Sequence, residues 1–396
     1  MSTAVRKPLI ERLNVFTAFF FGALFAIVSW RLALTYLPAD SESAPLFTRE
    51  DKITLISMIS WFVGFMFGIG ALIGPVRWMA GKDLSHEENM FYAGKDMGLK
   101  RYFRYTTDHK VVGIQYLVVT MTIFGIAGVM AMMIRTNLAN PGGGLLNPQA
   151  YNSLVGTHGI MMIVGAIIMV TGPFGNYIMP IMIGARDMAF PRLNALSLWL
   201  IVAAAVPLIW GQFIGGISTG WVAYNPLAGQ APLGMNGYIM FICIFALSTM
   251  VAGSNITTTV IKMRAKGMTW NRTPIFIHGV VASVALALPA FPTFFLSQVM
   301  SGMDRALGTS FYVPKDGGSG WLYEHLFWLM GHPEVYVILI PAVAALMEMA
   351  PVFTRRPLYS FTVAVVGIAG IAGLSVLVWA HHMYMSGWAP LLNAPF

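Results

Sequence analysis

Residues 322–350 read LYEHLFWLMGHPEVYVILIPAVAALMEMA, an almost continuous apolar run that is long enough to cross a bilayer as one helix. Three residues with polar side chains, His332, Glu334 and Tyr336, lie in the middle of this run. Polar groups in hydrocarbon are costly without partners, so their presence there indicates a function. His332 and Tyr336 lie one helical turn apart and therefore share a face of the helix. The run predicts a membrane-spanning helix that carries part of a binding site.

A second apolar run, residues 359–388, contains the adjacent histidines His381 and His382. Neighbours on a helix differ in direction by about 100°, so both imidazoles can reach one ion beside His332. Three neutral imidazoles suit copper or zinc, and an open fourth position suits chemistry rather than a structural role. The alternative is buried histidines bonded to helix carbonyls, which is adequate for one histidine but not for all three. The sequence therefore predicts a metal site.

The composition is that of a polytopic membrane protein rather than a soluble domain. Of the 396 residues 57% are hydrophobic and only 10% are charged, and the mean hydropathy is +0.69. The single cysteine, Cys243, excludes an intrachain disulfide, a thiolate cluster and covalent haem attachment through two cysteines. The net charge of +8 comes from short loops between apolar runs, which indicates membrane topology and not nucleic-acid binding.

Nine apolar runs have spanning length, and they predict an all-α, polytopic transmembrane helix bundle. They are residues 14–36, 54–79, 111–134, 153–182, 195–219, 237–262, 275–301, 322–350 and 359–388.

Charge alternates between the loops that join these runs. Residues 80–110 are rich in Lys and Arg, whereas residues 136–150 and 222–236 carry no charge. Because positive charge collects on the cytoplasmic side, this pattern predicts a cytoplasmic N-terminus. The same topology puts four histidines at similar depth, in the outer half of a hydrocarbon core about 30 Å thick. They are His158, His332, His381 and His382.

Several short blocks of sequence follow one another in a recognisable order. They include Thr107-Asp108-His109-Lys110, Gly184-Ala185-Arg186-Asp187-Met188-Ala189-Phe190-Pro191-Arg192, Gly331-His332-Pro333-Glu334-Val335-Tyr336 and Trp379-Ala380-His381-His382. Together they resemble subunit I of the haem–copper terminal oxidases, over residues 107–396. The resemblance implies that this part comprises the first seven of the family's twelve helices. Residues 1–106 would add two further helices and a basic cytoplasmic linker, a docking surface for a partner subunit.

The resemblance implies roles for polar residues in the runs 322–350 and 359–388. His332, His381 and His382 would bind the copper of the binuclear centre. Tyr336 would be joined covalently to His332 and would supply a proton and an electron when the O–O bond breaks.

Three further residues match residues that lie around the low-spin haem in members of the family. His158 would be one axial ligand, Arg135 would approach the polar edge of that haem, and Trp221 would lie near the propionates. The alternatives are a snorkelling interfacial arginine and an interfacial tryptophan.

The resemblance also implies a proton route from Asp187 on an inner turn to Glu334 near mid-membrane. Polar groups must hold water along such a route, because protons do not cross hydrocarbon. An alternative for Asp187 is a helix cap or a loop salt bridge. The candidates between the two carboxyls are Asn176, Asn194, Ser248, Thr249 and Asn255.

The family continues through five more helices, whereas this sequence stops at Phe396. The second ligand of the low-spin haem, the ligand of the high-spin haem and the lysine of a second proton path would lie beyond it. We therefore expect either a truncated sequence or a second chain that completes the site.

By the same resemblance, the protein would reduce O2 to water with four electrons and pump protons across the inner (plasma) membrane of a prokaryote, in contact with membrane lipid. Subunit II with a copper centre and subunit III would be partners. Quinol-oxidising relatives of the enterobacterial kind carry Arg and Asp where this chain has Ile126 and Met130, which favours cytochrome c over quinol as donor. Rival interpretations are a quinol oxidase, a nitric oxide reductase, against which Tyr336 argues, and a non-catalytic scaffold or fragment.

Overall fold

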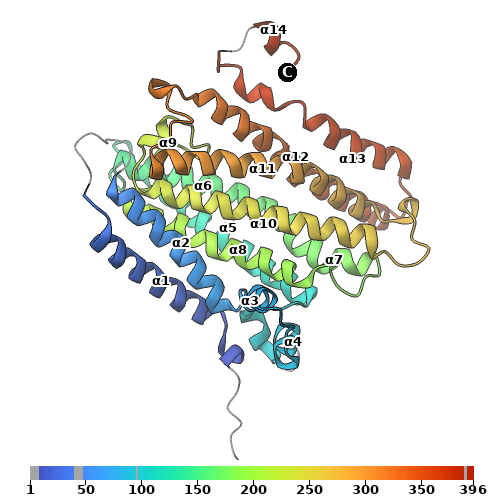
Figure 1. Cartoon of the computed structure of the whole chain (residues 1–396). Coiled ribbons are helices and arrows are strands. Elements are labelled where there is room, and N and C mark those ends of the chain that lie inside the picture. Colours follow the sequence, from blue (N-terminus) through green and yellow to red (C-terminus); the bar gives the residue numbers. More distant parts are fainter. Residues whose placement is uncertain (1–8, 40–47, 95–96, 388–389) are drawn as a thin grey trace, which may run out of the picture.

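The computed structural model describes residues 9–39, 48–94, 97–387 and 390–396. Figure 1 shows long helices that run side by side in a single bundle, with short helices and loops at its ends. The described residues contain no strand, and nine of their helical stretches are long and apolar enough to cross a membrane. The chain is an all-α, multi-pass membrane protein, as its sequence predicts.

Most residues of the chain lie in the spanning stretches. They are α1 (Val15–Tyr36), α2 (Arg49–Ile69), α5 (His109–Ala139), α6 (Pro148–Met169) continued through the π-helical η3 (Val170–Phe174) into α7 (Gly175–Met182), α8 (Pro191–Gly211) with η4 (Gln212–Ile214), α10 (Gly234–Lys262), α11 (Ile275–Leu307), α12 (Gly320–Thr354), and α13 (Phe361–Ser375) with the 3-10 turn η7 (Trp379–Met383). The short elements are η1 (Leu9–Arg12), α3 (Ile73–Met79), α4 (His86–Ala93), η2 (Gly98–Phe103), α9 (Leu227–Gln230), η5 (Trp270–Arg272), η6 (Pro314–Asp316) and α14 (Pro390–Asn393).

Two of the predicted helices are broken inside their apolar runs, and a third, predicted over 195–219, ends at Ile214. The run 54–79 is not one helix, because Gly70 adopts a left-handed conformation with φ of 87° and ends α2. The helix also begins earlier, at Arg49, where the Thr48 hydroxyl accepts a hydrogen bond from the Asp51 amide. In the last run α13 ends at Ser375, so the two histidines lie on the 3-10 turn η7 and not on a continuous α-helix.

Helices α1 and α2 form a tight hairpin on one side of the bundle (Figure 1). A Cβ atom on Gly64 would lie 2.4 Å from the carbonyl oxygen of Phe21, and one on Gly68 would lie 2.4 Å from that of Thr17. Glycine at these positions lets the two backbones approach, as in other membrane helix pairs. The indole of Trp61 donates to the Ala203 carbonyl at 3.2 Å and so joins the hairpin to α8.

The linker between the hairpin and α5 folds against one end of the bundle, where Figure 1 shows α3 and α4 together. The Tyr92 hydroxyl donates to the Gly70 carbonyl at 2.8 Å. The Gln115 amide donates to the carbonyls of Tyr102 and Arg104 at 3.0 and 2.9 Å. These bonds hold the linker against the end of α2 and against α5.

Candidate metal centre

Three histidines from two elements of the chain meet inside the bundle. His332 comes from α12, and His381 and His382 come from η7. One ring nitrogen from each lies within 4.8 Å of the others. The Nδ1 atom of His332 is 3.2 Å from the Nε2 atom of His382. This separation is short enough for the two nitrogens to share a proton or to bind one ion, and the predicted trio is brought together.

The donor set fits a soft or borderline metal such as copper. His332 is 6% exposed, and its Nε2 atom is buried with no hydrogen-bond partner among the described residues. A buried imidazole nitrogen without a partner is costly, and a metal ion would remove that cost. Three neutral imidazole nitrogens are typical ligands of copper and zinc.

The ring of Trp328 holds His382 in place. The two rings are parallel within 1°, and their centroids are 3.9 Å apart. The indole of Trp328 donates to the Tyr224 hydroxyl at 2.5 Å, which fixes the ring plane. Trp328 precedes His332 by about one turn on α12. The same helix therefore positions His332 and the ring that stacks on His382. Sequence reasoning did not select Trp328, because its role depends on a contact between distant segments.

Tyr336 lies beside His332, one turn further along α12. Their ring centroids are 4.8 Å apart, with planes inclined by 59°. The proximity fits the predicted covalent partnership, which remains a prediction. Glu334 lies between them in sequence and is 4% exposed. Because it is two residues from each, it projects from a different face of α12 than the two rings do.

One ring nitrogen of His158 bonds to the backbone of a neighbouring helix. The residue lies half-buried on α6, and its Nδ1 atom is 2.9 Å from the Ala127 carbonyl oxygen on α5. A carbonyl only accepts, so Nδ1 carries the proton and Nε2 keeps the free lone pair. Such an outer bond also fixes the ring orientation of metal-binding histidines in general.

Trp221 lies close to α6, whereas Arg135 lies near the C-terminal end of the neighbouring helix α5. A Cβ atom on Gly159, next to His158, would lie 3.3 Å from the Cβ atom of Trp221. The ring of Trp221 also lies 5.9 Å from that of Trp328, centroid to centroid. Arg135 is exposed near the C-terminal end of α5. The tryptophan thus lies between the His158 helix and the histidine cluster.

Asp187 lies in the loop between α7 and α8. Burial raises the pKa of Asp187, while the Met188 amide, which donates to its Oδ1 atom at 2.7 Å, and the nearby His109 oppose the rise. The helix cap considered as an alternative is not observed, because the residue before α8 is Phe190. Among the described residues Asp187 also forms no ion pair.

Two asparagines on the way from Asp187 into the bundle have unsatisfied polar atoms. Asn176 is 2% and Asn194 is 1% exposed. The Oδ1 atom of Asn176 and the Nδ2 atom of Asn194 are buried without hydrogen-bond partners among the described residues. Buried polar atoms of this kind are commonly satisfied by internal water. The pair thus suits a water-filled route.

Ser248 belongs to a hydrogen-bonded chain that continues from Asn194. Its hydroxyl donates to the Ser197 carbonyl at 2.6 Å, and the Ser197 hydroxyl lies 2.7 Å from the hydroxyl of Tyr116. Sequence reasoning did not select Ser197 or Tyr116. The position of Ser197, one turn after Asn194 on the same helix face, was the available signal.

The other two predicted members of the route make different contacts. Thr249 donates to the Phe245 carbonyl of its own helix at 3.0 Å. Asn255 is fully buried, accepts from the Phe190 amide at 2.8 Å and donates to the Phe190 carbonyl at 3.3 Å. Asn255 therefore anchors the loop that carries Asp187.

Comparison with known proteins shows the family of the chain. Residues 111–396 match the family model of cytochrome c and quinol oxidase polypeptide I. The chain is 38% identical over 297 residues to cytochrome c oxidase subunit 1 of Thermostichus vulcanus, covering 74% of this chain and 54% of the relative. It is 39% identical over 293 residues to the Bacillus subtilis protein of the same name, covering 74% and 47%.

The chain thus spans about half the length of the curated relatives that it matches. The match includes the segments that carry the histidine cluster, His158 and Asp187. This chain belongs to the family of cytochrome c and quinol oxidase polypeptide I.

Proposed function

We propose that the chain is part of the catalytic subunit of a respiratory terminal oxidase, which reduces O2 to water with four electrons at a haem–copper centre and pumps protons. The observation that carries the proposal is the cluster of His332, His381 and His382 with Tyr336 beside it. Cytochrome c is the proposed donor. The names of the relatives support this choice, as does the presence of Ile126 and Met130 in place of Arg and Asp.

The three clustered histidines would hold copper, and the Nε2 atom of His158 would hold the low-spin haem. Bound there, copper and haem would supply the redox chemistry with O2. Trp328 would keep the His382 ring aligned, and the Ala127 carbonyl would keep His158 in the tautomer that binds iron. We assign the ligand of the high-spin haem and the second ligand of the low-spin haem to residues outside this sequence.

Two further residues would act at the edge of the low-spin haem. Arg135 would supply a positive charge toward its polar edge, and Trp221 would pack near its propionates. The position of Trp221 against Gly159, beside His158, supports its part of this assignment.

The remaining polar residues would move protons to this centre. Asp187 would take up protons at the membrane surface, and waters held by Asn176, Asn194, Ser248 and the nearby Thr249 would pass them inward. Asn255 would hold the Asp187 loop in place. Glu334 would hold a proton near the copper ligands, and the Tyr336 phenol would deliver a proton and an electron to the reacting oxygen.

The proposal extends to the organisation of the complex. Residues 107–396 would be the first seven helices of the oxidase domain, and residues 1–106 would be an added hairpin and linker. A copper-bearing subunit II and a subunit III would complete the complex in a prokaryotic plasma membrane. The basic loops support a cytoplasmic N-terminus.

The test is a reduced-minus-oxidised absorption spectrum of the complex purified through this chain, recorded with and without carbon monoxide. We expect two haem signals, one of which shifts with carbon monoxide, together with bound copper by elemental analysis. Absence of haem absorption would overturn the proposal. Oxygen consumption with reduced cytochrome c and with quinol then distinguishes the two donors.

A further inference from the structure

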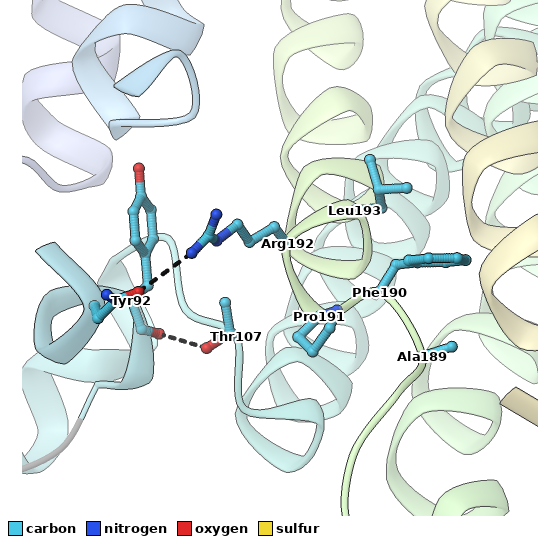
Figure 2. Close-up of a pocket in the computed structure, with 8 residues that line it drawn as sticks. Tyr92, Thr107, Ala189, Phe190, Pro191, Arg192 and Leu193 are labelled. Atoms are coloured by element: carbon cyan, nitrogen blue, oxygen red, sulfur yellow. Dashed lines mark hydrogen bonds between the residues drawn. The ribbon is translucent and has the colours of Figure 1, made fainter. Parts of the chain in front are cut away.

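A cavity of about 460 Å³ lies between the N-terminal linker and the part of the chain that matches the family. Asn89 and Tyr92 of α4 line one side, and Thr107 lies at its base. The opposite side is formed by the end of the Asp187 loop and the first turn of α8, Ala189 to Leu193. Figure 2 shows Arg192 extending from α8 across this cavity toward α4.

Arg192 contributes a positive charge that neutral groups surround. Its Nη2 atom donates to Oδ1 of Asn89 at 3.2 Å, and its guanidinium carbon lies 5.7 Å from the ring centroid of Tyr92. Glu88 is the acidic residue adjacent to Asn89, but its carboxylate is bound by Arg77 at 2.9 Å. Within the described part of the chain Arg192 has no ion pair. A guanidinium has five donors, so Arg192 retains both charge and hydrogen-bonding capacity for an anion.

The cavity lies where a membrane surface would be. Pro191 begins a membrane-spanning stretch that continues to Ile214, so the cavity lies at the boundary between hydrocarbon and water. Phe190 and Leu193 line it and are 45% and 41% exposed. Figure 2 shows their side chains on the side of α8 away from Tyr92. A ligand that binds Arg192 and extends past the start of α8 therefore passes from a cation to an apolar surface.

The neighbouring linker has the composition of an interfacial segment. Trp78 of α3 is 80% exposed, and Leu99 and Phe103 of η2 are 79% and 52% exposed. The basic residues Lys100 and Arg101 lie among them. Exposed aromatic and aliphatic side chains beside Lys and Arg are typical of surfaces that lie on anionic lipid.

We propose that this cavity binds the phosphate group of an anionic phospholipid, with Arg192 as its cationic partner and with the acyl chains over Phe190 and Leu193. The N-terminal end of α8, which has no side-chain cap, lies at the cavity and adds a favourable electrostatic contribution for an anion. Because the adjacent surface is apolar, a lipid fits the whole site better than free phosphate does. The site joins α4 and Thr107 to residues 189–193, so that the lipid stabilises this part of the linker against the oxidase domain.

The experiment compares lipid retention by the intact purified complex, using native mass spectrometry after exchange into phosphatidylglycerol or phosphatidylcholine. The main variant is Asn89→Asp, which keeps the size of the side chain and its hydrogen bond to Arg192 but neutralises the cation. We expect this variant to retain about fivefold less phosphatidylglycerol, the effect of one basic residue near an anionic surface. Arg192→Gln should do the same, and Arg192→Lys should retain more lipid than Arg192→Gln.

The matched control is Arg272→Gln, which removes one exposed cation from a loop next to the Asp187 loop, outside the cavity. It should retain phosphatidylglycerol like the unmodified complex. Phosphatidylglycerol should raise the unfolding temperature of the unmodified complex, and neither phosphatidylcholine nor inorganic phosphate should do so. Equal loss of lipid in the control and in Asn89→Asp, or unchanged retention in Asn89→Asp, would refute the site. An increase with inorganic phosphate alone would show that a free anion is the ligand.

Discussion

Asp51 of α2 and Arg305 of α11 form a buried ion pair with a nitrogen–oxygen distance of 2.6 Å. Their side chains are 9% and 3% exposed. Asn236 of α10 bridges them, because it donates to Asp51 at 2.9 Å and accepts from Arg305 at 2.9 Å. Arg305 also donates to the carbonyls of Ala228, Gly229 and Ala231. The N-terminal hairpin therefore supplies the counter-ion of an arginine that organises the loop after Trp221.

Replacement of Asp51 by Asn should destabilise the protein strongly. A buried arginine without its counter-ion costs about 3–5 kcal/mol, so the unfolding temperature of the purified complex should fall. Asp316→Asn, at an exposed carboxyl of η6, is the control and should have no effect. The double variant Asp51→Leu with Arg305→Met removes the unpaired charge but also the donor to the Ala228, Gly229 and Ala231 carbonyls, so it should recover stability only in part. Equal unfolding temperatures for Asp51→Asn and the control would show that the pair contributes little.

Replacement of His332 by Asn should abolish copper binding while the haem proposed to bind at His158 remains. Loss of one of three imidazole ligands leaves too few donors for a stable site. The measurement is the ratio of copper to protein by elemental analysis, alongside the low-spin haem spectrum. His278→Asn removes a histidine whose Nε2 contacts the Trp270 carbonyl, away from the cluster, and should leave copper unchanged. Copper retained in His332→Asn would contradict the assignment.

Trp328→Leu should weaken copper binding without removing a ligand. The His382 ring would lose its parallel partner at 3.9 Å, and loss of such an outer contact typically lowers metal affinity by about 10–100-fold. Copper retention during dialysis against a graded series of chelator concentrations measures this. Tyr224→Phe, which keeps the ring but removes the hydroxyl that accepts from Trp328, should have a smaller effect. If the two variants retain copper equally well, the stacked ring does not position His382.

Asp187→Asn should change how stability depends on pH. Partial burial raises the pKa of Asp187 above its ordinary value of 3.8, so folding favours the protonated carboxyl. The stability that this group confers is present at low pH and is lost as the pH rises from 3.8 through the raised pKa. Because the substituted amide does not ionise, the variant should become more stable than the unmodified protein as the pH increases. Thermal unfolding at a series of pH values checks this. The exposed Asp83→Asn variant should show no such divergence.

Much of the architecture could be read from the sequence because it depends on local properties. A run of apolar residues spans a bilayer whatever its neighbours are, so the helical stretches and the all-α class followed from length and hydropathy. The motif around His332 and the pair His381-His382 identified, by residue type, three side chains that the fold brings together. Gly70 is a residue type that often ends a helix, but the apolar residues on both sides of it concealed the end of α2.

Only the tertiary structure decided which distant side chains meet. The contact of Asp51 with Arg305 joins residues 254 positions apart, and that of Tyr116 with Ser197 joins residues 81 apart. The stacking of Trp328 on His382 and the cavity beside Arg192 likewise need segments that helix packing brings together. Periodicity specifies which face of a helix a residue occupies, whereas the rotation and neighbour of each helix follow from packing of the whole bundle. The sequence by itself therefore determined the helices and the residue types of the proposed ligands, and packing determined how those side chains are held.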